Sequence, residues 1–431
     1  MKIDLSLDRS LAWGRGGSVR YLRALISAPP APDNTTPTPR NLAIALDNSG
    51  SMQGPSLSTA KTAITRVLDL LGPDDIFSLA AFNSDVTILA NALPLTGANR
   101  ALILDSLRHL EATSQTNLSH GWLSAARCAA SAMESFPAHH HHILVLSDGQ
   151  ANQGELNPDA LGQHAAELRA RGLTSSAIGI GEGYAQTQLK PIAEQGGGRL
   201  HDAQYTHEIL EVVSAELTDL LFTAARDLEL TLTTPPDVEA ECLSNFPSRL
   251  TLGRLRAQLG LLPHTRQRDC IFLLKLPPGL PGESLPFSLR LSWTGHEGRK
   301  QTLDSPPLSL TFASSKDNRA QPRDIPTSLR VAETWQNSLI ERAVDLNRRG
   351  EFEEISTLLR NELQGFRRYV DGLPGGEAFL ENLTHLHQSA HRHWDERRRK
   401  ELTLSAFHSR RGEKDTRVTA RPGLGQQVRD L

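Results

Sequence analysis

A short polar run near residue 50 combines one carboxylate with two hydroxyls. Asp47, Ser49 and Ser51 alternate along the run DNSGS, directly after the apolar segment Asn41–Leu46. Carboxylate and hydroxyl oxygens suit a hard cation such as Mg²⁺, which takes about six oxygen ligands. Gly50 allows the tight turn that brings these oxygens together. The same residues would also cap a helix N-terminus, because Ser and Asp accept hydrogen bonds from the free N–H groups there.

Two further oxygen-bearing residues stand at related places in the chain. Thr116 precedes a helical segment in SQTNLSHGW, and Asp148 follows the apolar segment Ile143–Leu146 in LVLSDGQANQG. In doubly wound sheets, ligands bind beyond the carboxyl ends of the strands, so the loops after such strands are candidates to meet. Two carboxylates and three neutral hydroxyls leave an Mg²⁺ ion short of ligands, and the open position invites an external carboxylate.

Strands and helices alternate on both sides of these residues. The expected strands are Asn41–Leu46, Ile76–Phe82, an antiparallel Val86–Leu89, Ile143–Leu146, Leu173–Ile180 and Arg199–His201. The first expected helix begins at Leu57 and ends at Gly72-Pro73. The other expected helices cover Arg100–Leu110, Gly121–Glu134, Pro158–Arg171, Leu189–Gln195 and Thr206–Leu221. This alternation predicts a Rossmann-like, doubly wound α/β domain.

In this order and on this frame, LDNSGSM, TNL and LVLSDGQAN resemble the metal-ion-dependent adhesion site of von Willebrand factor A-type (VWA) domains. The segments SAIGIGEG and IAEQGGGRL also resemble that family, and the likeness covers roughly residues 41–221. The resemblance implies that Asp47, Ser49, Ser51 and Thr116 ligate the cation directly or through water. It implies that Asp148 acts mostly through water, and that a partner's Asp or Glu supplies the last oxygen.

The resemblance implies a metal-dependent protein-binding scaffold or adaptor, with Mg²⁺ as the expected cation and Mn²⁺ or Ca²⁺ as alternatives. We expect no catalysis, because no general base and no second metal site is evident beside the five residues. One alternative is a VWA adaptor subunit that presents substrate to an AAA+ ATPase, although this chain has no G-x-x-x-x-G-K-[ST] motif of its own. The other alternative is a metal-dependent hydrolase.

A serine hydrolase would need a nucleophile on a strand-to-helix turn. Ser49 and Ser51 follow a strand, but the G-x-S-x-G elbow is absent, and nothing specifies His120 or His201 as the base.

Two further runs favour structural roles. The glycines of the G-x-G-x-G run Gly179–Gly183 come late in the sheet and lack the spacing of the dinucleotide fingerprint, so they predict a turn. The run His139–His142 predicts a solvated loop before a strand, with adventitious metal binding as the alternative.

After residue 221 the alternation of strands and helices ends. Strand-like segments cover Leu228–Thr234, Arg249–Leu255, Cys270–Leu276, Ser288–Trp293 and Leu308–Phe312, which predicts a β-sandwich. Three amphipathic helices follow. We therefore expect N-terminal strands at 1–36 that join the sandwich, a VWA domain at 37–221, the sandwich at 222–315, a helical domain at 327–405 and a disordered tail at 406–431.

Composition sets broad limits on the class of protein. The chain has 431 residues, 38% hydrophobic and 22% charged, with a formal net charge of −3, so nothing demands nucleic acid or a membrane as a partner. No stretch of about 18 apolar residues predicts a membrane span, and the N-terminus lacks the apolar core of a secretory signal. Three cysteines without CxxC spacing, namely Cys128, Cys242 and Cys270, suggest buried thiols in a reduced compartment. We expect a cytoplasmic, bacterial protein.

Overall fold

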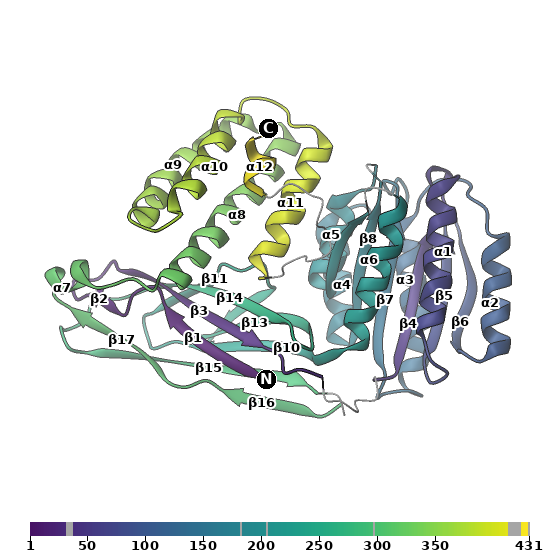
Figure 1. The fold of residues 1–431 in the computed structure, drawn as a ribbon, viewed down its shortest axis with the longest axis horizontal. Helices are drawn as coiled ribbons and strands as arrows, with labels where there is room; N and C mark the ends of the chain where they lie inside the picture. The colour runs from purple at the N-terminus through teal and green to yellow at the C-terminus, as the bar shows by residue number, and fades with distance from the viewer. Residues whose placement is uncertain (32–37, 182, 204–205, 296–297, 413–423, 430–431) are drawn as a thin grey trace. The chain divides into compact units, whose positions relative to one another are not determined.

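The computed structural model describes residues 1–431 except 32–37, 182, 204–205, 296–297, 413–423 and 430–431, and it divides into two compact units (Figure 1). The first unit comprises Pro30–Asp227 and Thr294–Lys300 and contains the α/β sheet. The second comprises Met1–Pro29, Leu228–Trp293 and Gln301–Leu431 and contains the remaining strands and helices. The second unit is therefore built from segments on both sides of the first.

The α/β unit is organised around a six-stranded sheet with the order β6-β5-β4-β7-β8-β9. Its strands are β4 (Arg40–Asp47), β5 (Ile76–Phe82), β6 (Val86–Pro94), β7 (His140–Ser147), β8 (Leu173–Ile180) and β9 (Gly197–Ala203). Strand β6 pairs antiparallel with β5, whereas all the other neighbours are parallel. Every residue of β4 and β7 is buried, as expected for parallel strands that helices cover on both faces. The predicted Rossmann-like sheet is confirmed.

Helices lie on both faces of this sheet. They are α1 (Pro55–Leu70), α2 (Gly97–His109), α3 (Leu118–Met133), α4 (Pro158–Ala170), α5 (Gln186–Gln195) and α6 (Thr206–Leu221), with a short 3₁₀ turn η1 (Gly50–Met52) before α1. Ser175 of β8 accepts a hydrogen bond from Trp122 of α3, whereas the next residue, Ser176, donates to Glu216 of α6. Successive side chains of a strand point to opposite faces, so α3 and α6 cover opposite faces.

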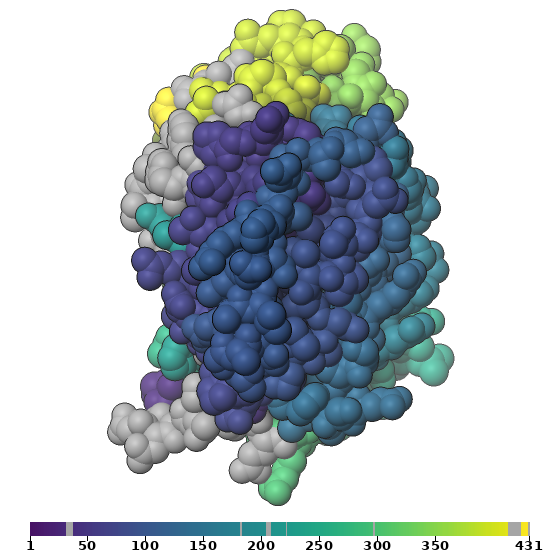
Figure 2. Space-filling model, turned by 90° about the vertical axis from the view of Figure 1, so that its right-hand side faces the viewer, coloured from purple at the N-terminus to yellow at the C-terminus, as the bar shows by residue number. Residues whose placement is uncertain are grey.

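The outer edge of the sheet is formed by β6, which α2 contacts. Figure 2 views the side of the molecule on which these elements lie. Apolar side chains such as Ile88 and Leu102 are 43% and 63% exposed there. Isolated exposed apolar residues are common on protein surfaces and indicate no function by themselves.

The second unit contains a β-sandwich of two sheets. One sheet has the order β1-β3-β14-β11, and the other has the order β12-β13-β10-β15-β17-β2 with β16 paired to β15. The strands are β1 (Lys2–Leu7), β2 (Leu11–Trp13), β3 (Val19–Ser27), β10 (Thr223–Thr233), β11 (Glu239–Cys242), β12 (Ser248–Thr251), β13 (Arg254–Pro263), β14 (Gln267–Lys275), β15 (Ser284–Thr294), β16 (Lys300–Asp304) and β17 (Leu308–Ala313). Strand β3 pairs with β14, and β2 pairs with β17, so N-terminal strands belong to both sheets.

All but the first of the C-terminal helices pack around a common apolar core, and the first has no buried residue. The helices are α7 (Ser315–Ala320), α8 (Ile325–Arg349), α9 (Phe352–Val370), α10 (Gly376–Gln388), α11 (Glu396–Arg410) and α12 (Leu424–Arg429). The sequence predicted three helices here and disorder from residue 406, but α11 continues to Arg410 and α12 follows. Val428 of α12 joins the buried core with Leu402 and Ala406 of α11, and this packing stabilises segments whose composition is polar. Residues 413–423 of the expected tail lie outside the described residues.

Within the part of the chain that the structure describes, no helix has the length and apolar character needed to span a lipid bilayer.

Candidate metal centre

Three loops meet at the carboxyl end of the sheet and bring the predicted residues together. The loop after β4 is joined to the segment before α3 by backbone hydrogen bonds from Gly50 N to Ser114 O (3.0 Å) and from Thr113 N to Asn48 O (2.8 Å). The side-chain amide of Asn48 also donates to the carbonyl of Glu111 at 2.8 Å. These bonds hold the run from Asp47 to Ser51 beside the segment that carries Thr116.

Thr116 is held between two loops. Its N–H donates to Asn152 Oδ1 at 3.2 Å, and its carbonyl accepts from Asn152 N at 3.1 Å, so it is attached to the loop after β7. The next residue, Asn117, caps α3 by accepting from His120 N at 3.1 Å. In α3, a Cβ at Gly121 would lie 2.1 Å from Phe82 Cγ, so only glycine lets this helix approach β5 so closely. Thr116 is only 4% exposed.

The hydroxyls of Ser49, Ser51 and Thr116 surround one small space. Ser49 Oγ lies 3.1 Å from Ser51 Oγ, and Ser51 Oγ donates to Asp148 Oδ1 at 2.7 Å. A Cβ added at Gly149 would lie 3.1 Å from Thr116 Oγ1, 3.2 Å from Ser51 Oγ and 3.8 Å from Ser49 Oγ. Gly149 therefore leaves open a cradle that any larger residue would fill. In the sequence, the only signal for Gly149 is its place directly after Asp148.

Asp47 is fully buried, and both of its carboxylate oxygens accept hydrogen bonds. Oδ1 accepts from Ser49 N at 2.8 Å, and Oδ2 accepts from Ser147 Oγ at 2.5 Å. Ser147 is the last residue of β7, and the sequence analysis missed it. Its only signal was a hydroxyl at the end of an otherwise apolar strand. Together these two donors fix the orientation of the carboxylate.

The surroundings of Asp47 and Asp148 disfavour the charged form of both carboxylates. Burial raises the pKa of Asp47. Burial also raises the pKa of Asp148 to about 6, and the nearby charge of Asp47 acts in the same direction. Among the described residues, neither carboxylate forms an ion pair with a lysine, arginine or histidine. A cation between the two would oppose both causes of the shift.

This set of side chains fits a hard divalent cation. It offers two carboxylates and three hydroxyls around a space of atomic size, and oxygen ligands of this kind suit Mg²⁺, Mn²⁺ or Ca²⁺. No cluster of three or more histidine, cysteine, aspartate and glutamate side chains arranged for a metal occurs in the described residues. The hydroxyls are therefore essential to any cation site here, because the two carboxylates alone would be too few ligands.

The structure offers no serine–histidine pair at this place. In the described part of the chain, no hydrogen bond joins Ser49 or Ser51 to a histidine. His120 is exposed at the start of α3, and His201 Nε2 is bonded to Glu216 Oε2 at 2.8 Å. Among the described residues, neither serine therefore has a histidine as its general base.

The histidine run lies at the opposite, amino end of the sheet. The prediction of a solvated loop is wrong, because β7 begins at His140, and His140, His141 and His142 are 4%, 6% and 3% exposed. Asn41 Nδ2 lies 3.0 Å from His141 Nδ1, and Thr174 Oγ1 lies 2.7 Å from His142 Nδ1. Apolar periodicity alone placed the start of the strand at Ile143, because it takes histidine as a polar residue.

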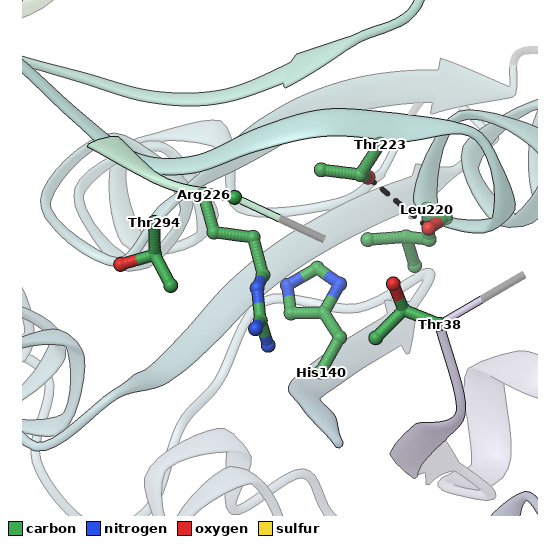
Figure 3. A pocket seen from close by; sticks show the side chains of 7 residues that line it. Thr38, His140, Leu220, Thr223, Arg226 and Thr294 are labelled. Carbon is green, nitrogen blue, oxygen red and sulfur yellow. Dashed lines mark hydrogen bonds between the residues drawn. The ribbon is translucent and has the colours of Figure 1, made fainter. Parts of the chain in front are cut away.

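A small pocket opens beside His140 (Figure 3). The imidazole ring of His140 lies between the guanidinium of Arg226 and the side chain of Thr38. Arg226 Nη1 donates to the carbonyl of His139 at 3.1 Å. The pocket volume of about 10 Å³ is room for roughly one water molecule, so it has no space for an organic substrate.

Gly181 and Gly183 lie in turns, as predicted, whereas Gly179 still belongs to β8. Gly181 has φ +70°, a conformation that favours glycine. A Cβ at Gly179 would lie 2.3 Å from a ring carbon of Tyr184, so glycine is required there by close packing rather than by a nucleotide.

Comparison with known proteins identifies the α/β unit. The profile of the family described as von Willebrand factor type A domain matches residues 41–213. The chain carries a VWA domain. A solved structure described as von Willebrand factor type A from Catenulispora acidiphila matches with a TM-score of 0.71 and 15% identity, and the match covers 94% of this chain and 96% of that one. The likeness of fold thus extends well beyond the VWA domain.

The curated relatives that share sequence with the chain include a bacterial and a human protein. A Synechocystis protein called Uncharacterized protein sll0103 is 28% identical over 72% of this chain and 76% of its own length. Human inter-alpha-trypsin inhibitor heavy chain H4 is 26% identical over 52% of this chain, but the match spans only 24% of that protein. The predicted VWA domain and its likeness to a bacterial relative are confirmed.

Proposed function

We propose that the VWA domain binds a partner protein through one divalent cation, and that an aspartate or glutamate of the partner completes the coordination. The residues proposed to hold the cation are Asp47, Ser49, Ser51, Thr116 and Asp148. The observation that carries the proposal is the convergence of three hydroxyls on the cradle beside Gly149, with the buried carboxylate of Asp47 and the half-buried carboxylate of Asp148 next to it.

Mg²⁺ is the cation we favour, with Mn²⁺ or Ca²⁺ as alternatives. Hydroxyls and carboxylates are hard ligands, and Mg²⁺ keeps several waters when few protein oxygens are supplied. When bound, the cation would supply positive charge and a coordination position for the partner's carboxylate. The role of this chain is to orient the ligands: Ser147 and the Ser49 N–H hold Asp47, and two loops hold Thr116.

We infer a scaffold or adaptor role rather than catalysis. The hydroxyls of Ser49 and Ser51 have no contact with a histidine in the described residues, so a general base for hydrolysis is not supplied by that route. Binding of one carboxylate needs only the open coordination position. The dependence of Thr116 on two separate loops makes the affinity sensitive to the positions of those loops.

The test is capture of partners from a lysate of the source organism, with Mg²⁺ and with EDTA, read by mass spectrometry. The wild-type chain should retain a set of proteins in Mg²⁺ that EDTA releases, and Thr116→Ala should lose the same set. The matched control is Thr113→Ala in the same loop, whose side chain is exposed. Retention of those proteins by Thr116→Ala, or in EDTA, would contradict the proposal.

A further inference from the structure

Two cysteines of the β-sandwich have their thiols in contact. Cys242 ends β11, Cys270 lies in β14, and their Sγ atoms are 3.7 Å apart. In the antiparallel register Cys242 lies opposite Phe272, and Leu243 N donates to Ile271 O at 2.9 Å beyond it. Since Cys270 stands two residues from Phe272, Cys242 and Cys270 point to the same face of the sheet. The sequence analysis treated both only as buried thiols, because 27 residues separate them along the chain.

The two thiols differ in their access to solvent. Cys242 is partly exposed on β11, the edge strand of its sheet, whereas Cys270 is fully buried on β14. Burial raises the pKa of the Cys270 thiol well above its usual value, so Cys270 stays protonated. An oxidant from solvent therefore meets Cys242 first, and Cys270 is protected in the position of a resolving thiol.

We propose that Cys242 and Cys270 are a reversible oxidation site, and that hydrogen peroxide converts them to a disulfide. Cys242 loses its proton, and its sulfur attacks a peroxide oxygen: the S–O bond forms, the O–O bond breaks, and the leaving hydroxide takes up the proton as water. Cys270 sulfur then attacks the Cys242 sulfenic acid: the S–S bond forms, the S–O bond breaks, and the proton of Cys270 leaves with that hydroxyl as water. Two thiols are oxidised, and one peroxide is reduced to two waters. A small dithiol restores the pair by thiol–disulfide exchange.

The bond requires little movement. An S–S bond is about 2.05 Å long, so the sulfurs must approach by roughly 1.7 Å from their present 3.7 Å separation. The backbone between the strands is already paired at this point through Cys242, Leu243 and Ser244, whose Oγ accepts from Ile271 N at 3.0 Å.

The segment that follows Cys242 anchors α11. The carbonyl of Leu243 accepts from Arg410 Nη2 at 2.6 Å and Nε at 3.2 Å, and the carbonyl of Asn245 accepts from Arg411 Nε at 2.9 Å. Arg410 also forms a salt bridge with Glu341 of α8. A disulfide at Cys242 would tie the start of this segment covalently to β14. Oxidation would thereby tighten the attachment of α11 to the sheet.

The experiment treats the full chain with hydrogen peroxide, blocks the remaining thiols with iodoacetamide and identifies the linked peptides by mass spectrometry. We expect a Cys242–Cys270 linkage in the wild type, with Cys128 alkylated, and full reversal by dithiothreitol. Cys128→Ser is the matched control and should form the same bond. Cys270→Ser should stop at a sulfenic acid on Cys242 that dimedone traps, whereas Cys242→Ser should form no intramolecular bond.

Three results would overturn the proposal. The first is a wild type in which dimedone traps as much Cys242 sulfenic acid as in Cys270→Ser, because Cys270 would then not resolve it. The second is a linkage that involves Cys128 or a second copy of the chain in place of the Cys242–Cys270 bond. The third concerns the loop of 27 residues between the two cysteines: closing it should raise the unfolding midpoint of the oxidised wild type by several degrees, and an unchanged or lower midpoint would contradict the bond in the folded protein.

Discussion

The two ends of the VWA sheet differ in whether their carboxylates pair with a cationic side chain. At the amino end, Arg40 of β4 and Asp75 form a buried salt bridge, with Arg40 Nε 2.9 Å from Asp75 Oδ1 and Arg40 Nη2 2.5 Å from Asp75 Oδ2. The backbone N–H groups of Arg40 and Gly72 also donate to this carboxylate. At the carboxyl end, Asp47 and Asp148 are surrounded by hydroxyls and N–H groups, with no cationic side chain paired to them among the described residues.

This difference separates a structural cluster from a candidate site. A buried charge is costly unless an opposite charge or several hydrogen bonds compensate it. At the amino end, the opposite charge for Asp75 comes from Arg40 of the same chain. At the carboxyl end, hydrogen bonds alone stabilise the two carboxylates beside an open cradle, and no cationic side chain of the described residues pairs with them, so an external cation can add the missing opposite charge. The predictions below test this asymmetry, from the largest expected effect to the smallest.

Breaking the salt bridge at the amino end should cause the largest loss of stability. Arg40→Ala leaves the Asp75 carboxylate buried and unpaired, and we expect the free energy of unfolding to fall by about 3–5 kcal/mol. Urea unfolding measures this loss, and Mg²⁺ should not change its size. The double variant Arg40→Met/Asp75→Leu should recover much of the loss, because it removes both charges. A loss below about 1 kcal/mol in Arg40→Ala would mean that the two ends do not differ in this way.

At the carboxyl end the missing charge should be supplied by the solution. At about 100 times its Kd, Mg²⁺ should raise the free energy of unfolding of the wild type by roughly 2.7 kcal/mol over EDTA. Asp47→Ala should abolish this increment. Gly149→Ala should also reduce it, by up to about 1.4 kcal/mol for each tenfold loss of affinity, because its Cβ enters the cradle without removing a ligand.

The matched control for the cradle is Gly97→Ala at the start of α2, where an added Cβ meets nothing within 4 Å. Thermal unfolding with and without Mg²⁺ measures the increment for the wild type and for the three variants Asp47→Ala, Gly149→Ala and Gly97→Ala. Equal melting of the wild type in EDTA and in Mg²⁺ would remove the basis for a cation at this end. A Gly149→Ala variant that keeps the full increment would show that the cation, if bound, lies elsewhere than beside Gly149.

Acid should weaken the amino end through its buried histidines. Burial lowers the pKa of His142 to about 4, against about 6.5 when unfolded. Its stabilisation is therefore fully present above pH 6.5 and is lost as pH falls toward 4, because the unfolded state takes up the proton first. We expect a loss of about 3 kcal/mol over this range in EDTA, and a shallower pH dependence in His142→Gln.

The matched control for this titration is His109→Gln, since the His109 side chain is 78% exposed. Unfolding midpoints between pH 4 and 7 measure the slope for each variant. A slope in His142→Gln as steep as in the wild type would show that His142 does not carry the acid sensitivity of the amino end.

Prediction from sequence succeeded where the signal was local. The apolar runs of β4 and β5, the helix that Gly72-Pro73 terminates, and the order of the three polar loops could all be recognised along the chain. It failed where residues that are distant in the sequence but close in space determine whether a segment forms a strand or a helix. His140 to His142 belong to a strand because α/β packing buries that end of β7, and α12 forms because Val428 meets a core made by other helices. Neither effect is visible in a window of a few residues.

What the sequence by itself determined is the inventory and its order: the run DNSGS, Thr116 and Asp148, each placed next to a strand or helix with the periodicity of a doubly wound sheet. Only the tertiary structure decided that Ser147 orients Asp47, that Gly149 keeps the space between three hydroxyls open, and that the thiols of Cys242 and Cys270 touch. The physical reason is that periodicity reports which face a side chain takes on its own element. Contacts at 3 Å between residues far apart in the chain depend on the register of strands and the closure of loops.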